Sequence, residues 1–209
     1  RLVSDWSSDV CSSDLGRTLF FDDIALDLEG RIYVSERVLD HVWRLNPGGS
    51  EAAIWWTSPR LPDVTQYEPA GLAFSAARNS LIISDSALNA LYEVPVDAPD
   101  PQVETRTLFL YDREMEYPGF DGVATSPEGE IFVAALGLNR VARLDEASGE
   151  LIYLAGAFRG SSGLAYDNLR RRLFVSNWDQ RSLLPVDVIF FEIEIDPHLP
   201  FAIDVIVLP

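Results

Sequence analysis

Acidic side chains recur at matching places in this sequence, and their chemistry stands out from that of the other residues. Asp22 and Asp121 each stand near the start of a short apolar run, FDDIALD and FDGVATS, 99 residues apart. Carboxylates that share a funnel repel each other and lose solvation. A hard divalent cation removes that cost, and Ca²⁺ takes about six to eight oxygen ligands of this type. The pair therefore predicts a metal site for Ca²⁺, with Zn²⁺ as the alternative, in which Asp121 is also the candidate catalytic residue.

The same aspartates also have a simpler interpretation, because Asp before a strand often bonds to its own backbone two residues on. Both interpretations stay open for Asp121, and for Asp22 the neighbouring Asp23 could take the same role. A second set of polar residues lies at the ends of the following strands: Glu36, Asp85 and Asn177. We expect these three to be turn residues or to line the rim of a channel.

Other catalytic patterns are missing from the sequence. The two histidines, His41 and His198, lie far apart and form no metal-ligand cluster. No GxSxG elbow and no Gly-rich phosphate loop is present. The aspartates are therefore the main candidates for chemistry.

The elements that must position these residues are strands. From residue 19 onward, alternating β-branched and aromatic runs are separated by Gly, Pro, Asn and Asp. Residues 22–46 align with residues 121–145 without a gap, and ten of the 25 positions are identical. Related units lie between and after these two, with anchors spaced by 48, 51 and 41 residues: Asp23, Gly71, Gly122 and Gly163.

Four-stranded units that repeat every 40 to 50 residues or so are the signature of a β-propeller, because stacking hides the sheet faces that one unit cannot bury alone. We therefore predict an all-β propeller of four-stranded antiparallel blades at about residues 19–58, 69–112, 120–157 and 161–209. In the last blade the strands are expected at residues 161–167, 171–177, 188–196 and 201–208. The start of each innermost strand lies near the axis, so four residues are expected to converge there: Asp22, Ala70, Asp121 and Ser162.

Residues 1–18 are expected to lie outside the propeller as a non-native or disordered leader. The string DWSSDVCSSDL resembles the translation of a sequencing adaptor, so the native N-terminus is expected to be missing. Rings of six blades are common for this blade length, and about two blades are then absent. The remaining fragment would be an open arc whose exposed blade faces favour association.

The net charge of −17 argues against nucleic acid or an anionic membrane as a partner. No apolar run approaches the roughly 20 residues that a membrane-spanning helix needs. We expect a soluble protein, either of the bacterial cytoplasm or secreted, that binds a small-molecule substrate or ligand.

Two strings carry a family resemblance. FDG…PEGEIFVAALGLNRVARLD…SGE resembles a blade of the senescence-marker-protein/gluconolactonase family of regucalcin-like six-bladed propellers, and AGLAFSAARNSLIISDSALNALYEVPVD resembles the blade before it. The resemblance covers about residues 19–180. It implies one divalent metal in the channel, held by an acidic residue, an Asn and an Asp. It also implies hydrolysis of sugar lactones, with the metal polarising the carbonyl and the Asp acting on a water.

Residue by residue, the resemblance is partial. Asp121 matches the metal-binding Asp of the family, whereas Ala70 stands where the family has its metal-binding Asn. Leu19 and Phe21 stand where the family has a substrate-binding Arg-x-Asn.

Three functions therefore stay open. The first is a metal-dependent hydrolase of the sugar-lactone or ester type, favoured by Asp121. The second is a non-catalytic propeller similar to NHL-repeat proteins that binds a ligand or a protein, favoured by Ala70. A propeller similar to strictosidine synthase shares the same blades and is the third.

Overall fold

The structure, a computed structural model, describes residues 19–49, 51–62, 64, 66–111, 118–177 and 203–208. Their strands form four separate antiparallel sheets. The first two sheets consist of β1 (Phe21–Leu26), β2 (Ile32–Glu36), β3 (His41–Leu45) and β4 (Ala52–Thr57), and of β5 (Pro69–Ser75), β6 (Ser80–Asp85), β7 (Ala90–Pro95) and β8 (Arg106–Leu110). The last two consist of β9 (Phe120–Thr125), β10 (Ile131–Ala135), β11 (Arg140–Asp145) and β12 (Glu150–Gly156), with the 3-10 helix η1 (Leu136–Leu138), and of β13 (Ser161–Asp167), β14 (Arg172–Asn177) and β15 (Ile203–Val207).

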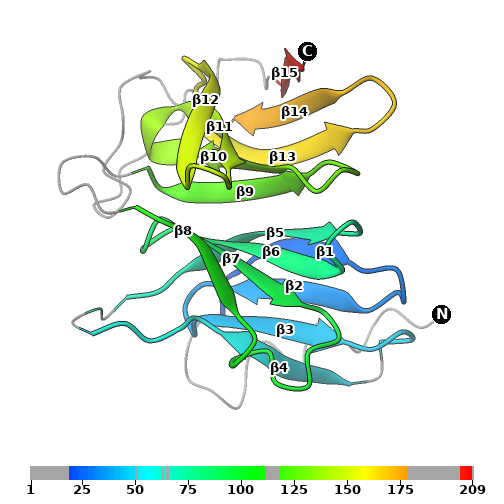
Figure 1. Ribbon diagram of the computed structural model, residues 1–209. Coiled ribbons are helices and arrows are strands. Elements are labelled where there is room, and N and C mark those ends of the chain that lie inside the picture. Colours follow the sequence, from blue (N-terminus) through cyan, green and yellow to red (C-terminus); the bar gives the residue numbers. More distant parts are fainter. Residues whose placement is uncertain are drawn as a thin grey trace.

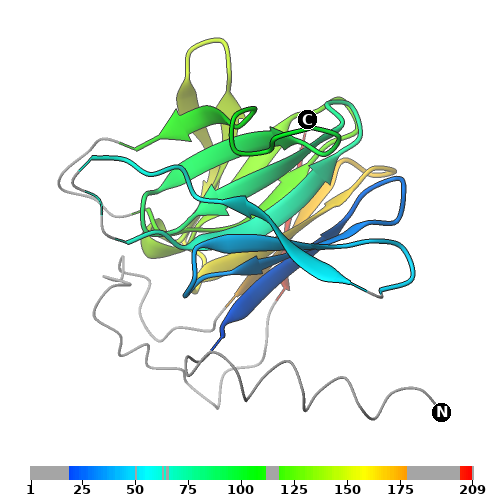
Figure 2. The ribbon, with the colours of Figure 1, turned by 90° about the horizontal axis from the view of Figure 1, so that it is seen from below.

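The sheets follow one another as the blades of a β-propeller, which confirms the predicted fold (Figure 1). Within each sheet the strands are ordered as they occur in the chain, and the innermost strands β1, β5, β9 and β13 are neighbours from one blade to the next. Seen from below, the blades are twisted and stacked face to face (Figure 2). Residues at the starts of the innermost strands are thereby brought to one end of the molecule.

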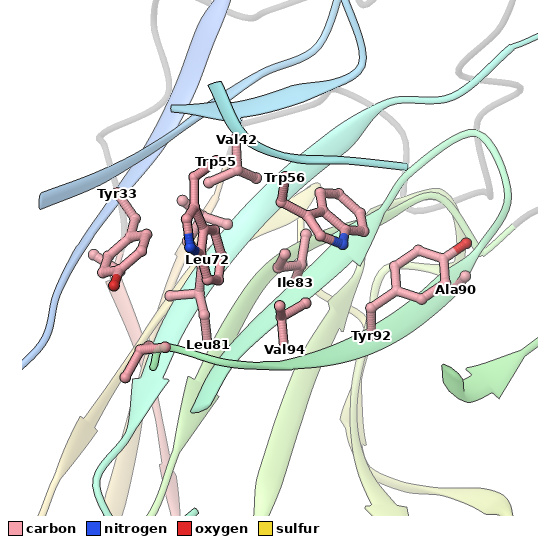
Figure 3. Packing of buried hydrophobic residues seen from close by; sticks show 12 residues of the cluster. Tyr33, Val42, Trp55, Trp56, Leu72, Leu81, Ile83, Ala90, Tyr92 and Val94 are labelled. Atoms are coloured by element: carbon pink, nitrogen blue, oxygen red, sulfur yellow. The ribbon is translucent and has the colours of Figure 1, made fainter. Parts of the chain in front are cut away.

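Each interface between consecutive blades has its own apolar core. In the first interface, Trp55 and Trp56 of β4 face Ile83 and Tyr92 of the second blade (Figure 3). The Trp56 and Tyr92 rings lie 5.5 Å apart, a distance at which tilted aromatic pairs attract each other beyond simple burial. A sheet with two apolar faces can bury both of them only by stacking between neighbouring sheets. The repeat of four-stranded units in the sequence and the stacking of blades therefore have the same cause.

The fourth blade differs from the prediction in its strand order. The stretch 201–208 was predicted to be the fourth strand, but β15 pairs directly with β14 and so takes the third position. The periodic pattern of a strand shows that it joins a sheet but not which edge it occupies, and this explains the error. The predicted strand at residues 188–196 lies outside the described residues, as does the predicted leader at residues 1–18.

The two end blades expose large apolar side chains on their strands. In the first blade these include Phe21, Ile24 and Leu26 of β1, and in the fourth they include Val205 and Val207 of β15. Equivalent positions inside the stack are covered by the next blade. In the part of the chain that the structure describes, no helix has the length and hydrophobicity needed to cross a bilayer.

Every innermost strand carries an irregularity at the same place. The ladder to the second strand is interrupted just after the first residue of β1, β5 and β13, and at the corresponding point of β9. Such bulges leave backbone groups unpaired and redirect side chains. In the second blade the freed Gly71 N–H donates to Ser84 Oγ at 2.8 Å, and Ser84 Oγ donates to the Asp121 carbonyl at 2.5 Å. One serine thus satisfies the bulge and ties it to the next blade.

Close contact between innermost strands requires glycine at this bulge. A Cβ on Gly71 would overlap the carbonyl oxygen of Asp121, and a Cβ on Gly122 would lie 2.5 Å from the carbonyl oxygen of Ser162. The glycine anchors of the sequence repeat are therefore the points where neighbouring backbones touch. The close contact at Gly122 also places Asp121, the residue before it, beside Ser162 of the next blade.

Candidate functional site

The predicted column of residues exists in the structure, because each member is the second residue of its innermost strand. These residues are Asp22, Ala70, Asp121 and Ser162. Asp121 Oδ2 accepts a hydrogen bond of 2.7 Å from Ser162 Oγ of the next blade. Asp22 lies close enough to Asp121 for its charge to act on that carboxyl. Ala70 lies between them in blade order and offers only a methyl group.

Two charged residues that the sequence analysis did not single out complete the site. Arg37 directly follows β2, and its Nη1 lies 3.1 Å from Asp22 Oδ2. Its Nη2 lies 3.0 Å from Oε2 of Glu68, the residue just before β5. The only sequence signal is for Arg37, which is a positive charge next to Glu36 at a repeat position that is uncharged in other blades; no signal marks Glu68. The corresponding positions of the next two blades, Ser86 and Leu136, are uncharged.

Burial controls the protonation of this cluster. Burial, and then the charge of Asp22, raises the pKa of Asp121 to about 6, against the opposing effects of the Ser162 hydroxyl and Arg37. Burial also raises the pKa of Asp22, although its contact with Arg37 acts in the other direction. Asp121 can therefore both accept and release a proton near neutral pH, as a general base or acid must.

Arg37 remains charged in this environment. Burial alone would lower the pKa of Arg37, but the charges of Asp22, Glu68 and Asp121 outweigh it and raise that pKa instead. The cluster thus contains a permanent positive charge that contacts two carboxylates, Asp22 and Glu68, and acts electrostatically on a third carboxyl, Asp121. It is accessible on one side, since the Asp22 and Glu68 side chains are 20% and 24% exposed.

The raised pKa of Asp121 gives a pH dependence of stability. A carboxyl whose pKa is higher in the folded state than in the unfolded state stabilises the fold at low pH, and this contribution is lost as pH rises through the folded value. For Asp121 the loss is expected between about pH 4 and pH 7, and a shift of about 2 units corresponds to roughly 3 kcal/mol at most. Asp121→Asn should therefore be more stable than the wild type at pH 8 and similar to it at pH 4.

Urea unfolding of both proteins across this pH range measures the effect. Asp27→Asn is a control of opposite sign: burial alone would raise the pKa of Asp27, but hydrogen bonds from Arg31 and Tyr33 outweigh it and lower that pKa, so this variant should lose stability relative to the wild type as pH rises. A constant difference between wild type and Asp121→Asn at all pH values would contradict the prediction.

The second predicted set of residues has a structural role. Glu36 is fully buried, and its carboxylate accepts backbone N–H bonds from Phe20, Val38 and Leu39. These bonds close the turn after β2, from which Arg37 extends. Each carboxylate oxygen of Glu36 is used within the backbone of its own blade.

Asp85 and Asn177 act in a similar way. Asp85 Oδ1 accepts from the backbone N–H groups of Glu68 and Leu88, at 3.1 and 2.9 Å. Asn177 Oδ1 accepts from the N–H of Arg159 at 3.0 Å. In the structure these side chains are therefore hydrogen-bonded to loop backbone, and they do not lie at Asp121. Asp85 nevertheless supports the site, because it fixes the backbone of Glu68.

The described residues do not fit the divalent cation that the family resemblance implies. Among them, no group of three or more His, Cys, Asp and Glu side chains is arranged to hold a metal ion. Asp22 and Asp121 offer carboxylates and Ser162 a hydroxyl, but Arg37 already pairs with Asp22. Ca²⁺ or Zn²⁺ at Asp121 and Asp22 stays a prediction, one that this arrangement of the described residues does not favour.

The second and third blades, which contribute Glu68 and Asp121 to this site, match a known protein family. Residues 63–155 match the family model of the SMP-30/Gluconolactonase/LRE-like region. The match contains the second blade and nearly all of the third, including Asp121, and confirms the resemblance inferred from the two blade strings. The search of curated proteins found no match.

Solved structures show the same fold at low sequence identity. A gluconolactonase from Xanthomonas campestris is 19% identical with a TM-score of 0.59, over 79% of this chain and 57% of that one. A calcium-binding protein, regucalcin, from Agrobacterium tumefaciens is 19% identical with a TM-score of 0.57, over 75% and 52%. A virginiamycin B lyase from Staphylococcus aureus is 13% identical with a TM-score of 0.59, over 81% and 53%. The chain thus spans about half the length of the structures it matches.

Proposed function

We propose that this chain carries the acid–base carboxyl of a hydrolase that acts on sugar lactones or related esters. The observation that supports this most directly is Asp121, a buried carboxyl at the axis with a pKa of about 6, within the segment that matches the SMP-30/gluconolactonase family. Lactone hydrolysis needs a base to activate water and an acid to protonate the leaving oxygen. One carboxyl that titrates near neutral pH can do both in turn.

The reaction requires two proton transfers at Asp121. In the first, the Asp121 carboxylate takes a proton from water while the water oxygen bonds to the carbonyl carbon of the lactone. The carbonyl oxygen then carries negative charge, which the guanidinium of Arg37 stabilises. In the second, the ring C–O bond breaks and its alkoxide takes the proton back from Asp121. The product is the open hydroxy acid.

Ser162 has a positioning role in this scheme. Its hydroxyl donates to Asp121 Oδ2 at 2.7 Å and so fixes the orientation of the carboxyl. This bond opposes the rise in pKa that burial causes.

A panel of γ- and δ-lactones of sugar acids, with nitrophenyl acetate as a simple ester, tests this proposal. We expect the chain to hydrolyse at least one lactone faster than buffer does, measured by acid release in a weakly buffered indicator solution. The assay is repeated with added Ca²⁺ and with a chelator. No hydrolysis under any of these conditions would contradict the proposal.

A non-catalytic, ligand-binding propeller is the second candidate. It is favoured by Ala70 in the acidic column and by a cavity of about 210 Å³ away from Asp121. Arg44, Trp55 and Pro99 are among the residues that line this cavity, which lies between the outer strands of the first blade and the loop after β7. It contains no carboxyl group, so its chemistry is suited to binding and not to hydrolysis.

A further inference from the structure

A single guanidinium contacts carboxylates from two blades and interacts electrostatically with a carboxyl of a third. Asp22 comes from the first blade and Glu68 from the loop that enters the second, and both contact Arg37 at 3.1 and 3.0 Å. Asp121 of the third blade lies within range of the same charge. These groups are far apart in the sequence, and only blade stacking brings them together. The arrangement resembles a cation site in which the cation is a side chain.

The guanidinium is held in place by its surroundings. The backbone N–H of Arg37 donates to the Phe20 carbonyl at 3.0 Å, and the side chain of Arg37 is only 12% exposed. Glu68 is fixed as well, because its backbone N–H donates to Asp85 and its Oε1 accepts from Gln66 Nε2 at 2.5 Å. An exposed ion pair contributes little to the stability of the fold. Partly buried carboxylates, in contrast, destabilise the fold when their counter-charge is removed. Arg37 therefore determines whether this cluster needs another cation.

We propose that Arg37 is a built-in cation that takes the place of a divalent metal ion between Asp22, Glu68 and Asp121. A guanidinium and a hard metal ion satisfy carboxylates in the same electrostatic way, and both cannot contact the same oxygens at once. Because a guanidinium is wider than an ion, it also holds the carboxylates further apart than a metal would. This agrees with the lack of a metal-sized group of ligands among the described residues.

The proposal concerns cation binding and does not depend on the hydrolase activity. With Arg37 in place the chain should have no need of a divalent ion. With Arg37 replaced by Met, which keeps an apolar stem of similar length, two carboxylates lose their partner. Asp22 and Glu68 are partly exposed and can turn inward, so with Asp121 and Ser162 they offer oxygen ligands suited to Ca²⁺.

Isothermal titration of Ca²⁺ into the wild type, Arg37→Met and Arg37→Lys tests this. We expect no saturable heat for the wild type or for Arg37→Lys, which retains the charge. For Arg37→Met we expect binding with a Kd of about 1 mM or tighter, in the range of weak protein calcium sites. Saturable Ca²⁺ binding to the wild type that disappears in Asp121→Asn would overturn the proposal.

A double variant and a stability measurement complete the test. Arg37→Met combined with Asp121→Asn should lose the Ca²⁺ binding gained by Arg37→Met alone. If Arg37→Met is unfolded without metal, thermal unfolding is followed with and without Ca²⁺, and refolding by Ca²⁺ supports the proposal. A folded Arg37→Met that binds no Ca²⁺, or an unfolded one that Ca²⁺ does not rescue, would refute it.

Discussion

Asp121→Asn is expected to lower kcat/KM for lactone hydrolysis by about 100-fold or more, the usual contribution of a general base. The amide keeps the shape of the side chain and can still accept the Ser162 hydroxyl bond, which measures 2.7 Å in the structure. It cannot take a proton from water, so both proton transfers at this position are lost. The assay compares initial rates on the best lactone of the panel at pH 7.

The stability of the same variant separates a catalytic role from a structural one. Because burial raises the pKa of Asp121, the neutral amide should be at least as stable as the carboxyl at pH 7. A variant that is inactive and stable thus supports Asp121 as the base. Full activity in a folded Asp121→Asn would exclude that role. Asp204→Asn is a useful control, since Asp204 lies on β15 of the fourth blade and contacts Asn177.

Gly122→Ala is expected to destabilise the fold by about 3 kcal/mol or more, the upper part of the usual range for overpacking. The added Cβ would lie 2.5 Å from the Ser162 carbonyl oxygen and 2.8 Å from the Cα of Gly163. Both are backbone atoms of the neighbouring innermost strand, so neither can move aside by changing a rotamer. Relief requires the third and fourth blades to separate, which opens their shared apolar core.

Gly156→Ala is the matched control. Gly156 ends β12, the outermost strand of the same blade, and a Cβ there would lie 3.4 Å from Cγ of the Arg140 side chain. That distance is ordinary contact with a flexible group, so the change should stay within about 0.5 kcal/mol. Urea unfolding of both variants gives the comparison. Similar stabilities for the two would show that the innermost strands are not in close contact at Gly122.

Much of the fold could be predicted because its signal is local and repeated. Strand alternation is a property of neighbouring residues, and the spacing of Gly71, Gly122 and Gly163 reports the contacts between innermost strands. The strand at residues 203–207 could be recognised as a strand, but its edge in the sheet could not. Pairing order depends on the path of the chain, which periodicity does not encode.

The candidate site was only partly predictable for a related reason. Asp22 and Asp121 could be found because they occupy equivalent places in two copies of one repeat. Arg37 and Glu68 lie outside the strands and 31 residues apart, and their ion pair joins two blades. Nothing in the repeat relates these two positions. Glu36 and Asp85 show the reverse case, since their repeat positions match but their carboxylates bind loop backbone.

The sequence by itself determined the propeller and the place of Asp121 on it, because both follow from a repeat that each blade must satisfy to be buried. Only the tertiary structure decided which charge faces that carboxyl. Pairing of β1 with β2 puts Arg37 beside Asp22 within the first blade, and stacking of the second blade brings Glu68 to the same guanidinium. The charges around Arg37 are therefore completed only by packing between blades, which the order of residues within a blade does not encode.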